Sequence, residues 1–195
     1  MKQTKPKYRQ IIDAAVEVIA ENGYHSSQVS KIAKRAGVAD GTIYLYFKNK
    51  EDILVSLFQE KMGVFIERIE SATTSRQTPS EKLRVLVETH FEQLSEDHHL
   101  AVVTQLELRQ SNKMLRMKIN SVLKKYLDVI DEIVEEGIRE EVFRDNINRK
   151  LVRQLIFGTI DEVVTNWVMK EERYDITKQA KEVHEMIVEG LLRRP

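Results

Sequence analysis

The sequence predicts an all-α protein of about nine helices, with a small three-helix domain in residues 1–50 and a larger helical domain in residues 51–195. Apolar residues recur at the spacing of a helix along almost the whole chain. No segment shows the strict alternation of apolar and polar residues that is typical of a half-buried strand. Glycine and capping residues interrupt the pattern at intervals that suit separate helices.

Short-range signals place the first helix. Apolar Ile12, Val16 and Ile19 recur at helical spacing near the N-terminus. Gly23 suits the left-handed residue that closes many helices. We therefore expect a helix at about residues 5–22.

The next two helices are expected to be joined by a short turn. Ser26, Ser27 and Gln28 offer an N-cap for a second helix, which Gly37 ends. Asp40 is expected to cap the third helix. Two helices joined by a few residues that include glycine are typical of a helix-turn-helix.

Six more helices are expected after this segment. Pro79 and Ser80 mark the restart of one of them after a polar break, and residues 96–99 and 144–146 are expected to be connectors. The predicted helices span about residues 50–72, 80–95, 100–110, 112–140, 149–170 and 177–192.

The chain contains no cysteine. Disulfides, thiolate zinc sites and a cysteine nucleophile are therefore excluded, and the composition fits a reducing compartment. No run is apolar enough to span a bilayer, and the basic N-terminal residues lead into an amphipathic segment unlike a signal peptide. We expect a cytoplasmic protein with no membrane partner.

The formal net charge of zero hides an uneven distribution of charge. Residues 1–50 contain nine Lys or Arg residues and four Asp or Glu residues, a balance of +5, and the rest of the chain carries −5. A second excess lies at residues 108–127, which hold six cations and no acid. The basic N-terminal domain suits a nucleic-acid partner, and a solvated helix face is the simpler interpretation of the second excess.

Residues 38–50 have the chemistry of a helix that contacts DNA. They offer hydroxyls, an exposed apolar side chain and two lysines, which proteins use on phosphates and base edges. Gly41 lets the backbone approach DNA closely, and the amides at the helix start favour a phosphate. Thr42 can present a hydroxyl to a phosphate or a methyl to thymine, and exposed Leu45 can contact a thymine methyl.

The other side chains of this segment divide between core and surface. Ile43 and Phe47, four residues apart, should face the core. Tyr44 and Tyr46 can each hydrogen-bond the DNA backbone, although Tyr44 could instead pack against the first helix and Lys48 could simply be solvated. The segment has no arginine for guanine, so part of the specificity is expected from DNA shape and spacing.

These motifs resemble the TetR family of bacterial repressors. The matching segments are Ile11-Ile12-Asp13-Ala14-Ala15, Gly23-Tyr24, Val29-Ser30-Lys31-Ile32-Ala33-Lys34-Arg35-Ala36-Gly37-Val38 and Gly41-Thr42-Ile43-Tyr44-Leu45-Tyr46-Phe47-Lys48-Asn49-Lys50-Glu51. The resemblance implies a homodimer on palindromic double-stranded operator DNA, with the third helix in the major groove and a C-terminal ligand domain. The residues expected to contact DNA are Ser27, Gln28, Lys31, Ala39, Gly41, Thr42, Tyr44, Leu45, Tyr46, Lys48 and Lys50.

Two apolar helix faces near the C-terminus suit a four-helix interface between subunits. The first comprises Val152, Leu155, Ile156, Ile160, Val163 and Trp167, and the second comprises Ile176, Ala180, Val183, Ile187 and Leu191. Ordinary core packing within one subunit would explain the same faces. The family resemblance favours the dimer.

In the family, the helices between the DNA-binding domain and this interface enclose an inducer. The residues that could line such a pocket are apolar side chains, each of which could equally be core, and the first cations of the acid-free segment. They are Phe91, Leu94, Val103, Leu106, Arg109, Lys113, Arg116, Tyr126, Ile130, Phe157 and Trp167. An apolar tunnel with cations at its mouth suits a ligand that has an apolar tail and a polyanionic head.

Residues 103–112 and 157–168 are similar to the TetR-family repressors of fatty-acid degradation in Bacillus-type bacteria. Those repressors are released from DNA by long-chain acyl-coenzyme A (acyl-CoA). The likeness implies a repressor of β-oxidation genes whose effector is the thioester, with no resident cofactor.

A rival interpretation keeps the family and changes the ligand. Glu107, Asp161 and Glu162, among the aromatic residues of the pocket, could bind a hydrophobic cation, as multidrug-sensing members of the family do. The acid-free segment counts against a cationic ligand.

An enzyme with a metal site is a different class of answer. His90, His98 and His99 with Asp97 contain metal-ligating groups, but they straddle a helix end without ligand spacing on one face. We expect neither a metal site nor an enzyme.

Overall fold

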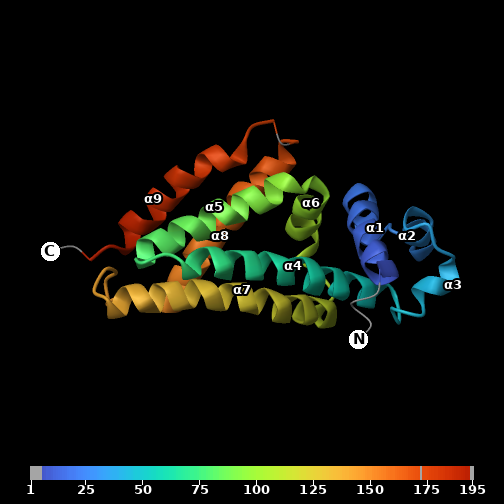
Figure 1. Ribbon diagram of the computed structural model, residues 1–195, viewed down its shortest axis with the longest axis horizontal. Coiled ribbons are helices and arrows are strands. Elements are labelled where there is room, and N and C mark those ends of the chain that lie inside the picture. The colour runs from blue at the N-terminus through green and yellow to red at the C-terminus, as the bar shows by residue number, and fades with distance from the viewer. Residues whose placement is uncertain (1–5, 172, 194–195) are drawn as a thin grey trace. The chain divides into compact units, whose positions relative to one another are not determined.

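The computed structural model describes residues 6–171 and 173–193, and within these ranges it contains nine α-helices, one 3-10 helix and no strand (Figure 1). The predicted all-α class is confirmed. The helices form two compact units, of which the first comprises residues 1–63 and 98–122 and the second residues 64–97 and 123–195. The functional boundary expected after residue 50 stays a prediction.

The first unit contains the helix-turn-helix. Its helices are α1 (Pro6–Asn22), α2 (Val29–Arg35) and the single-turn α3 (Asp40–Ile43), and α6 (His98–Glu107) packs on α1. Gly23 closes α1 with φ +72°, as predicted, and Gly37 precedes α3 with φ +64°. Lys5, where the first helix was expected to begin, lies outside the described residues.

Aromatic side chains form the part of this unit's core that lies just after α3. Ile43 and Phe47 are fully buried, which confirms the sequence prediction. The ring of Phe47 stacks on Tyr8 of α1, with 5.1 Å between the ring centroids. This contact fixes the segment after α3 against α1.

The predicted cap of α3 is wrong, whereas the N-cap of α2 lies within the predicted residues but makes no capping hydrogen bond. Ala39, rather than Asp40, is the N-cap of α3, and no side chain caps the helix. Gln28 is the N-cap of α2 without a side-chain bond. The Ser27 hydroxyl instead donates to the carbonyl oxygens of Val18 and Gly23, because the residue is buried against α1.

Two long helices contribute residues to both units. They are α4 (Lys50–Thr74) and α7 (Lys113–Arg139). The predicted connector at residues 96–99 shrinks to Asp97, and α6 ends at Glu107 rather than near residue 110. The apolar period marks a helix interior better than its frayed ends, which explains these shifts.

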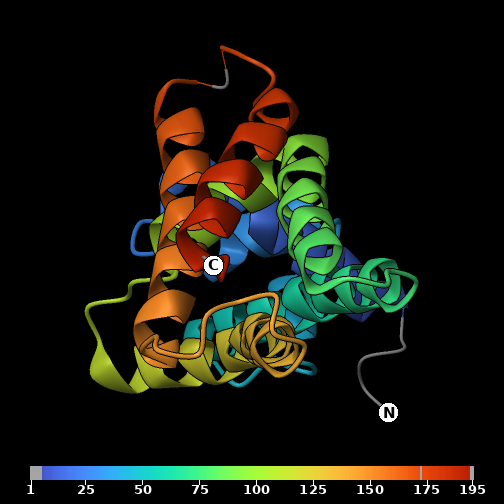
Figure 2. The ribbon, with the colours of Figure 1, turned by 90° about the vertical axis from the view of Figure 1, so that its left-hand side faces the viewer.

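The second unit is built around α5 (Pro79–Glu96). It packs on α8 (Arg149–Met169), the 3-10 helix η1 (Ile176–Gln179) and α9 (Ala180–Leu191), and Figure 2 shows α9 beside α5 and α8. A complete capping box starts α5, in which Thr78 and Glu81 exchange side-chain and backbone hydrogen bonds.

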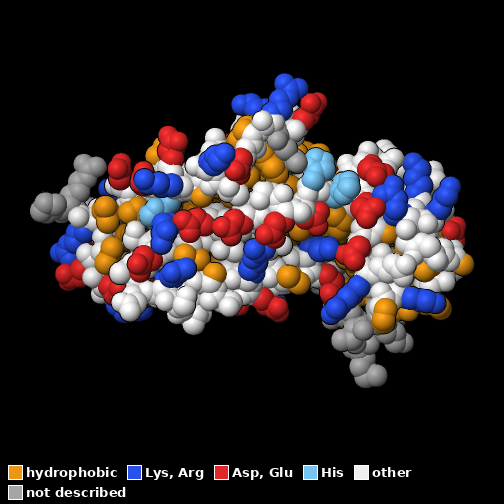
Figure 3. All heavy atoms as spheres, turned by 45° about the horizontal axis from the view of Figure 1, so that its top comes forward, with side chains coloured by type: hydrophobic (Ala, Val, Ile, Leu, Met, Phe, Trp, Pro, Cys, Tyr) orange, Lys and Arg blue, Asp and Glu red, His pale blue; other side chains and the backbone are white. Residues whose placement is uncertain are grey.

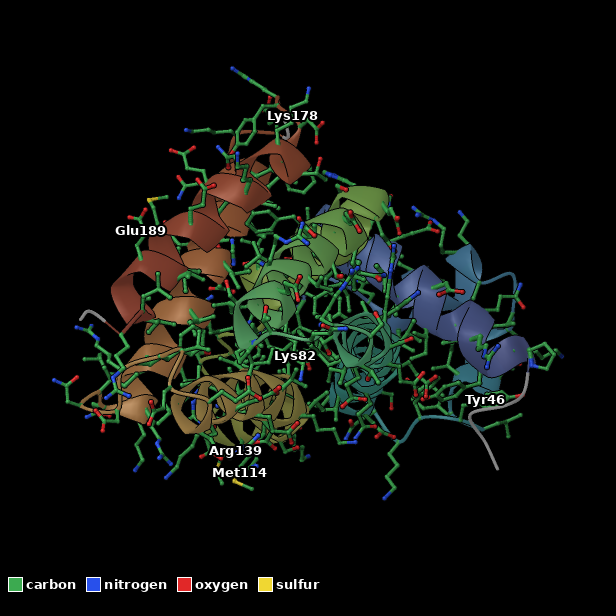
Figure 4. The ribbon with its side chains drawn as sticks, turned by 60° about the vertical axis from the view of Figure 1, so that its left-hand side comes forward. Tyr46, Lys82, Met114, Arg139, Lys178 and Glu189 are labelled. Atoms are coloured by element: carbon green, nitrogen blue, oxygen red, sulfur yellow. The ribbon has the colours of Figure 1, made fainter. Side chains whose placement is uncertain are left out.

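An ion pair links α5 to the C-terminal half of α7. The Lys82 ammonium lies 2.6 Å from a carboxylate oxygen of Glu136, and Figure 4 shows Lys82 on the side of α5 that faces α7. Both side chains are only 20% exposed. Loss of one partner would therefore leave a poorly hydrated charge.

The two apolar faces predicted for a subunit interface lie mainly inside the protomer. Buried members are Val152, Ile156, Ile160, Trp167, Ile176, Ala180, Val183, Ile187 and Leu191. They pack α8 and α9 into the second unit's own core, whereas Val163 is partly exposed and Leu155 is half exposed. The subunit interface itself stays a prediction. An apolar stripe shows that a face is covered without showing which neighbour covers it.

A polar pair sits inside the aromatic core of the second unit. The Nδ1 atom of His90 lies 2.9 Å from the hydroxyl oxygen of buried Tyr126. Phe65 and Phe157 contact these rings, with centroids 5.0 Å from His90 and 6.0 Å from Tyr126 respectively. Burial, followed by the nearby Asp161 carboxylate, raises the pKa of the Tyr126 hydroxyl.

We expect His90 to make stability depend on pH. Burial lowers its pKa to about 3, so between this value and the ordinary value near 6.5 the unfolded chain binds a proton that the native chain does not. Stability is therefore highest above pH 6.5 and falls as the pH drops toward 3. Between pH 7 and pH 5 this group should cost about 2 kcal/mol of unfolding free energy in urea titrations.

The comparison that isolates His90 uses variants. His90→Phe should lose this part of the pH dependence, because no titratable group remains at the site. The exposed His98→Gln variant serves as the control and should keep it. A His90→Phe variant with the wild-type dependence would contradict the assignment.

A close contact between Gly137 and Phe143 shapes the end of α7. A Cβ atom at Gly137 would lie 2.1 Å from the Phe143 ring. Gly137→Ala should therefore lower the unfolding free energy in urea by about 1–3 kcal/mol. Gly63→Ala, in a helix with open space around it, should be neutral or stabilising, and equal effects of the two changes would refute the clash.

Candidate functional site

The surface of α3 and the turn after it presents exposed side chains of several types. Tyr44 is 58% exposed and Leu45 is 69% exposed, so the alternative in which Tyr44 packs against the first helix is wrong. Gly41 and Lys48 are also exposed, and a Cβ atom at Gly41 would meet nothing within 4 Å. The predicted apolar and cationic groups therefore reach solvent together.

Other predicted DNA contacts lie beside this surface. Gln28, Lys31 and Ala39 are exposed, and Thr42 and Tyr46 are partly exposed. Figure 4 shows Tyr46 next to α1, where its ring centroid lies 6.3 Å from that of Tyr8.

Ser27 is a correction to the predicted set. It is only 2% exposed, its hydroxyl donates to two carbonyl oxygens, and its own N–H bonds to Gly23 and Tyr24. All of its donors are therefore used inside the protein. In the sequence, Ser26, Ser27 and Gln28 looked equally able to lie on the surface, and only the fold shows that Ser27 is buried.

Lys50 contacts the turn that leads to α2. Its ammonium donates to the His25 carbonyl oxygen at 2.9 Å and lies 4.6 Å from the centroid of the Tyr24 ring. Burial lowers the pKa of Lys50, and the Glu107 carboxylate opposes this effect. Lys50 is thus partly engaged within the protein at the first residue of α4.

Not every cation of this region is available to a partner. The Arg35 guanidinium pairs with Glu17 and Glu21 of α1 at 2.5 and 2.9 Å, which braces α2 on α1. Figure 3 shows acidic and basic side chains interleaved over the visible face of the helices around α1 and α2. Arg35 is therefore partly neutralised within the protein and contributes less positive charge to a partner than the sequence count suggests.

A buried carboxylate connects α6 to the turn after α1. Oε1 of Glu107 accepts the Tyr24 backbone N–H at 2.7 Å, and Oε2 accepts the side-chain amide of Gln110. Glu107 is only 8% exposed. Both of its oxygens are engaged, which leaves it poorly suited to receive a cationic ligand.

Four of the six cations of the acid-free segment lie in the loop after α6 or in the first two turns of α7. Arg109 and Lys113 are exposed, and the partly exposed Arg116 donates to the carbonyl oxygens of Gln110 and Ser111 at 2.6 and 3.1 Å. Lys118 is exposed as well, and Figure 4 shows Met114 pointing away from α7. The segment therefore offers several cations at one helix start.

The predicted apolar ligand residues differ in burial. Phe91, Leu94, Val103, Tyr126, Ile130 and Trp167 are buried, Phe157 is partly exposed and Leu106 is 52% exposed. The structure brings the rings of Tyr126 and Phe157 together. Trp167, near the end of α8, instead donates its indole N–H to the carbonyl oxygen of Tyr174, which follows that helix.

Sequence reasoning missed two members of this cluster, His90 and Phe65. The pattern contained a signal for His90, since it follows Leu83 and Val87 and precedes Leu94 at the spacing of one apolar helix face.

A shallow groove of about 660 Å³ runs along the exposed side of α8 in the second unit. Its lining residues are Gln154, Leu155, Gly158, Thr159, Glu162, Val163, Asn166, Lys170, Tyr174 and Gln179. Exposed Leu151 and Met169 on α8 and Met186 on α9 add apolar surface to this unit.

Residues 6–171 and 173–193 contain neither a cluster of metal-ligating side chains nor a candidate membrane span. No group of three or more His, Cys, Asp or Glu side chains there has the proximity to hold a metal ion, and the His98 and His99 rings contact each other edge-on. No helix in the same ranges combines the length and hydropathy of a membrane span.

Comparison with known proteins assigns both parts of the chain. Residues 11–57 match the model of bacterial regulatory proteins of the tetR family, and residues 58–190 match the C-terminal region of YsiA-like proteins. The chain is 61% identical to the fatty acid metabolism regulator protein of Bacillus subtilis, over 98% of each chain.

Two solved structures are similar to this chain. The transcriptional regulator FadR of Bacillus subtilis, in complex with stearoyl-CoA, has a TM-score of 0.92 at 61% identity and covers 94% of this chain and 98% of its own. The fatty acid degradation regulator FadR of Bacillus halodurans has a TM-score of 0.91 at 61% identity, with 95% and 100% covered.

The exposed α3 surface, the glycine-closed helix-turn-helix and these matches over nearly the whole length agree. The chain belongs to the TetR family of bacterial regulatory proteins.

Proposed function

We propose that this protein is a homodimeric transcriptional repressor that binds a palindromic operator and is released by long-chain acyl-CoA, in control of fatty-acid degradation genes. The observation that carries the proposal is the 61% identity, over nearly the whole chain, to a regulator whose structure contains stearoyl-CoA. We place its activity in the cytoplasm, where bacterial operators and acyl-CoA occur together.

The α3 surface is the DNA-contacting element of this proposal. Exposed Leu45 suits a thymine methyl, Tyr44 and Thr42 suit phosphate or base edges, and Lys48 suits a phosphate. Open space around Gly41 allows the backbone to approach DNA closely. Two copies of α3 would occupy half-sites about 34–36 Å apart, one helical turn of DNA.

The ligand we assign combines an apolar chain with a polyanion. Arg109, Lys113 and Arg116 lie within residues 108–127, a segment that contains no acid, and guanidinium groups bind phosphates strongly. The aromatic cluster around Tyr126 and Phe157 supplies apolar side chains. A hydrophobic cation is disfavoured because both Glu107 oxygens already accept hydrogen bonds.

Dimerisation is supported by the exposed side of α8 and α9. Leu151 is 61% exposed and Met186 58%, and the α8 groove contains Gly158 with no neighbour within 4 Å of a Cβ atom built there. Small and apolar residues on an exposed helix suit a helical partner. We therefore move the proposed interface from the buried faces predicted earlier to this exposed side.

The DNA assignment predicts a strong salt dependence. If the dimer contacts about eight phosphates, the operator binding constant should fall with salt at a log-log slope of about −7 in anisotropy titrations. Lys48→Ala should reduce the magnitude of the slope by about 2, since a dimer carries two copies of the residue. Lys178→Ala, an exposed change in η1, should match the wild type, and a wild-type slope near zero would refute DNA binding through phosphates.

The ligand assignment predicts a dependence on chain length and head group. Each two added methylenes should strengthen acyl-CoA binding by about 1.6 kcal/mol in calorimetry until the apolar site is full. Palmitate should bind much more weakly than palmitoyl-CoA, because it lacks the phosphates. Equal affinities for the acid and the thioester, or tighter binding of a lipophilic cation, would contradict the assignment.

A further inference from the structure

The Glu107 carboxylate joins two segments of the first unit that are 83 residues apart in the sequence. Through Oε1 it holds the backbone N–H of Tyr24, and through Oε2 it holds the side chain of Gln110. The turn after α1 and the loop between α6 and α7 therefore share one buried acid.

Helix electrostatics does not favour this position. Glu107 is the last residue of α6, and Tyr24 follows the C-terminal end of α1. Both helix ends carry partial negative charge, which repels a carboxylate. The Lys50 ammonium contacts the Tyr24 ring and the His25 carbonyl oxygen, and its positive charge opposes this repulsion. The acid is thus held by particular hydrogen bonds and one cation.

Gln110 completes this arrangement but keeps one unsatisfied atom. Its side-chain nitrogen donates to the carboxylate and, at 3.3 Å, to the backbone carbonyl oxygen of Glu107. Its Oε1 is buried and lacks a hydrogen-bond partner within the described part of the chain. An unsatisfied buried acceptor is unfavourable, so the Gln110 side chain is held less firmly than one whose polar atoms are all paired.

Arg116 connects this pair to the cations assigned to the ligand. Its guanidinium donates to the carbonyl oxygens of Gln110 and Ser111 and so holds the loop between α6 and α7. A phosphate group forms stronger, charge-assisted hydrogen bonds with the same guanidinium. Ligand phosphates and the loop carbonyls therefore compete for Arg116.

We propose that Glu107 and Gln110 are the positioning residues that transmit ligand binding to the helix-turn-helix. Phosphate draws Arg116 away from the loop, the Gln110 amide turns from Glu107, and the Tyr24 N–H loses a firmly held acceptor. The turn between α1 and α2 then ceases to fix α3 in its DNA-binding position. This inference rests on the proposed function and supplies its regulation.

The test measures separately how strongly the ligand weakens operator binding and how tightly the ligand itself binds. Operator affinity is measured by anisotropy with and without saturating palmitoyl-CoA, and palmitoyl-CoA affinity by calorimetry without DNA. The proteins are the wild type, Glu107→Gln, Gln110→Met and the control Glu92→Gln, which removes the same charge from an exposed site.

The ratio of the operator dissociation constant with palmitoyl-CoA to that without it should fall by at least about tenfold in Glu107→Gln and in Gln110→Met. In these variants ligand binding no longer changes the turn between α1 and α2. Their palmitoyl-CoA affinity should stay within about threefold of the wild type, because neither side chain is assigned to the ligand. Glu92→Gln should match the wild type in both measurements.

The outcomes separate this inference from the proposed function. If palmitoyl-CoA releases the wild type but both variants keep the wild-type ratio of operator dissociation constants, the coupling role alone is overturned. Weaker operator binding at an unchanged ratio would also overturn it, because that result indicates a purely structural role. If palmitoyl-CoA leaves wild-type operator binding unaffected, the proposed function fails and the coupling with it. If Glu107→Gln does not fold, Gln110→Met decides.

Discussion

The hydrogen bond from the Tyr24 backbone amide to the Glu107 carboxylate attaches the turn before α2 to α6. Gly23 ends α1 in the left-handed conformation, and the next amide has left the helix. In many helices that amide would bond back to the helix's own carbonyls. Here it bonds to α6 instead, so α2 and α3 are attached to a helix from a distant part of the sequence.

The same bond connects electrostatics to the proposed regulation. A hydrogen bond to a charged group contributes roughly 1.5–3 kcal/mol in proteins, so such a bond is a firm constraint while both partners stay in place. A thousandfold change in operator affinity requires about 4 kcal/mol of coupling. The loss of one such bond in each subunit of a dimer, about 3–6 kcal/mol together, is therefore of the size that release from DNA needs.

Local signals in the sequence were sufficient for the helices and for the exposed side of α3. Gly23, the spacing of Ile43 and Phe47, and the polar break before Pro79 each act within one or two helical turns. They predicted a helix end, two core residues and a helix start. The TetR resemblance rested on the same short motifs, which the matches over residues 11–57 confirm.

Long-range contacts were beyond the reach of these signals. Ile187 and Val183 showed an apolar face, but the sequence could not show that α5 and α8 of the same protomer cover it. Ser27 looked like a surface cap until α1 supplied its acceptors. Glu107 was considered only as a ligand group, because no short-range pattern connects it to Tyr24.

Hydrogen exchange at the Tyr24 backbone amide tests the central claim most directly. Residue-resolved exchange is measured on the full-length protein with and without palmitoyl-CoA. The account predicts that this amide is protected in the free protein and exchanges faster when the ligand is bound, while neighbouring amides inside α1 stay protected. Unchanged protection of Tyr24 under conditions in which the ligand releases operator DNA would contradict it.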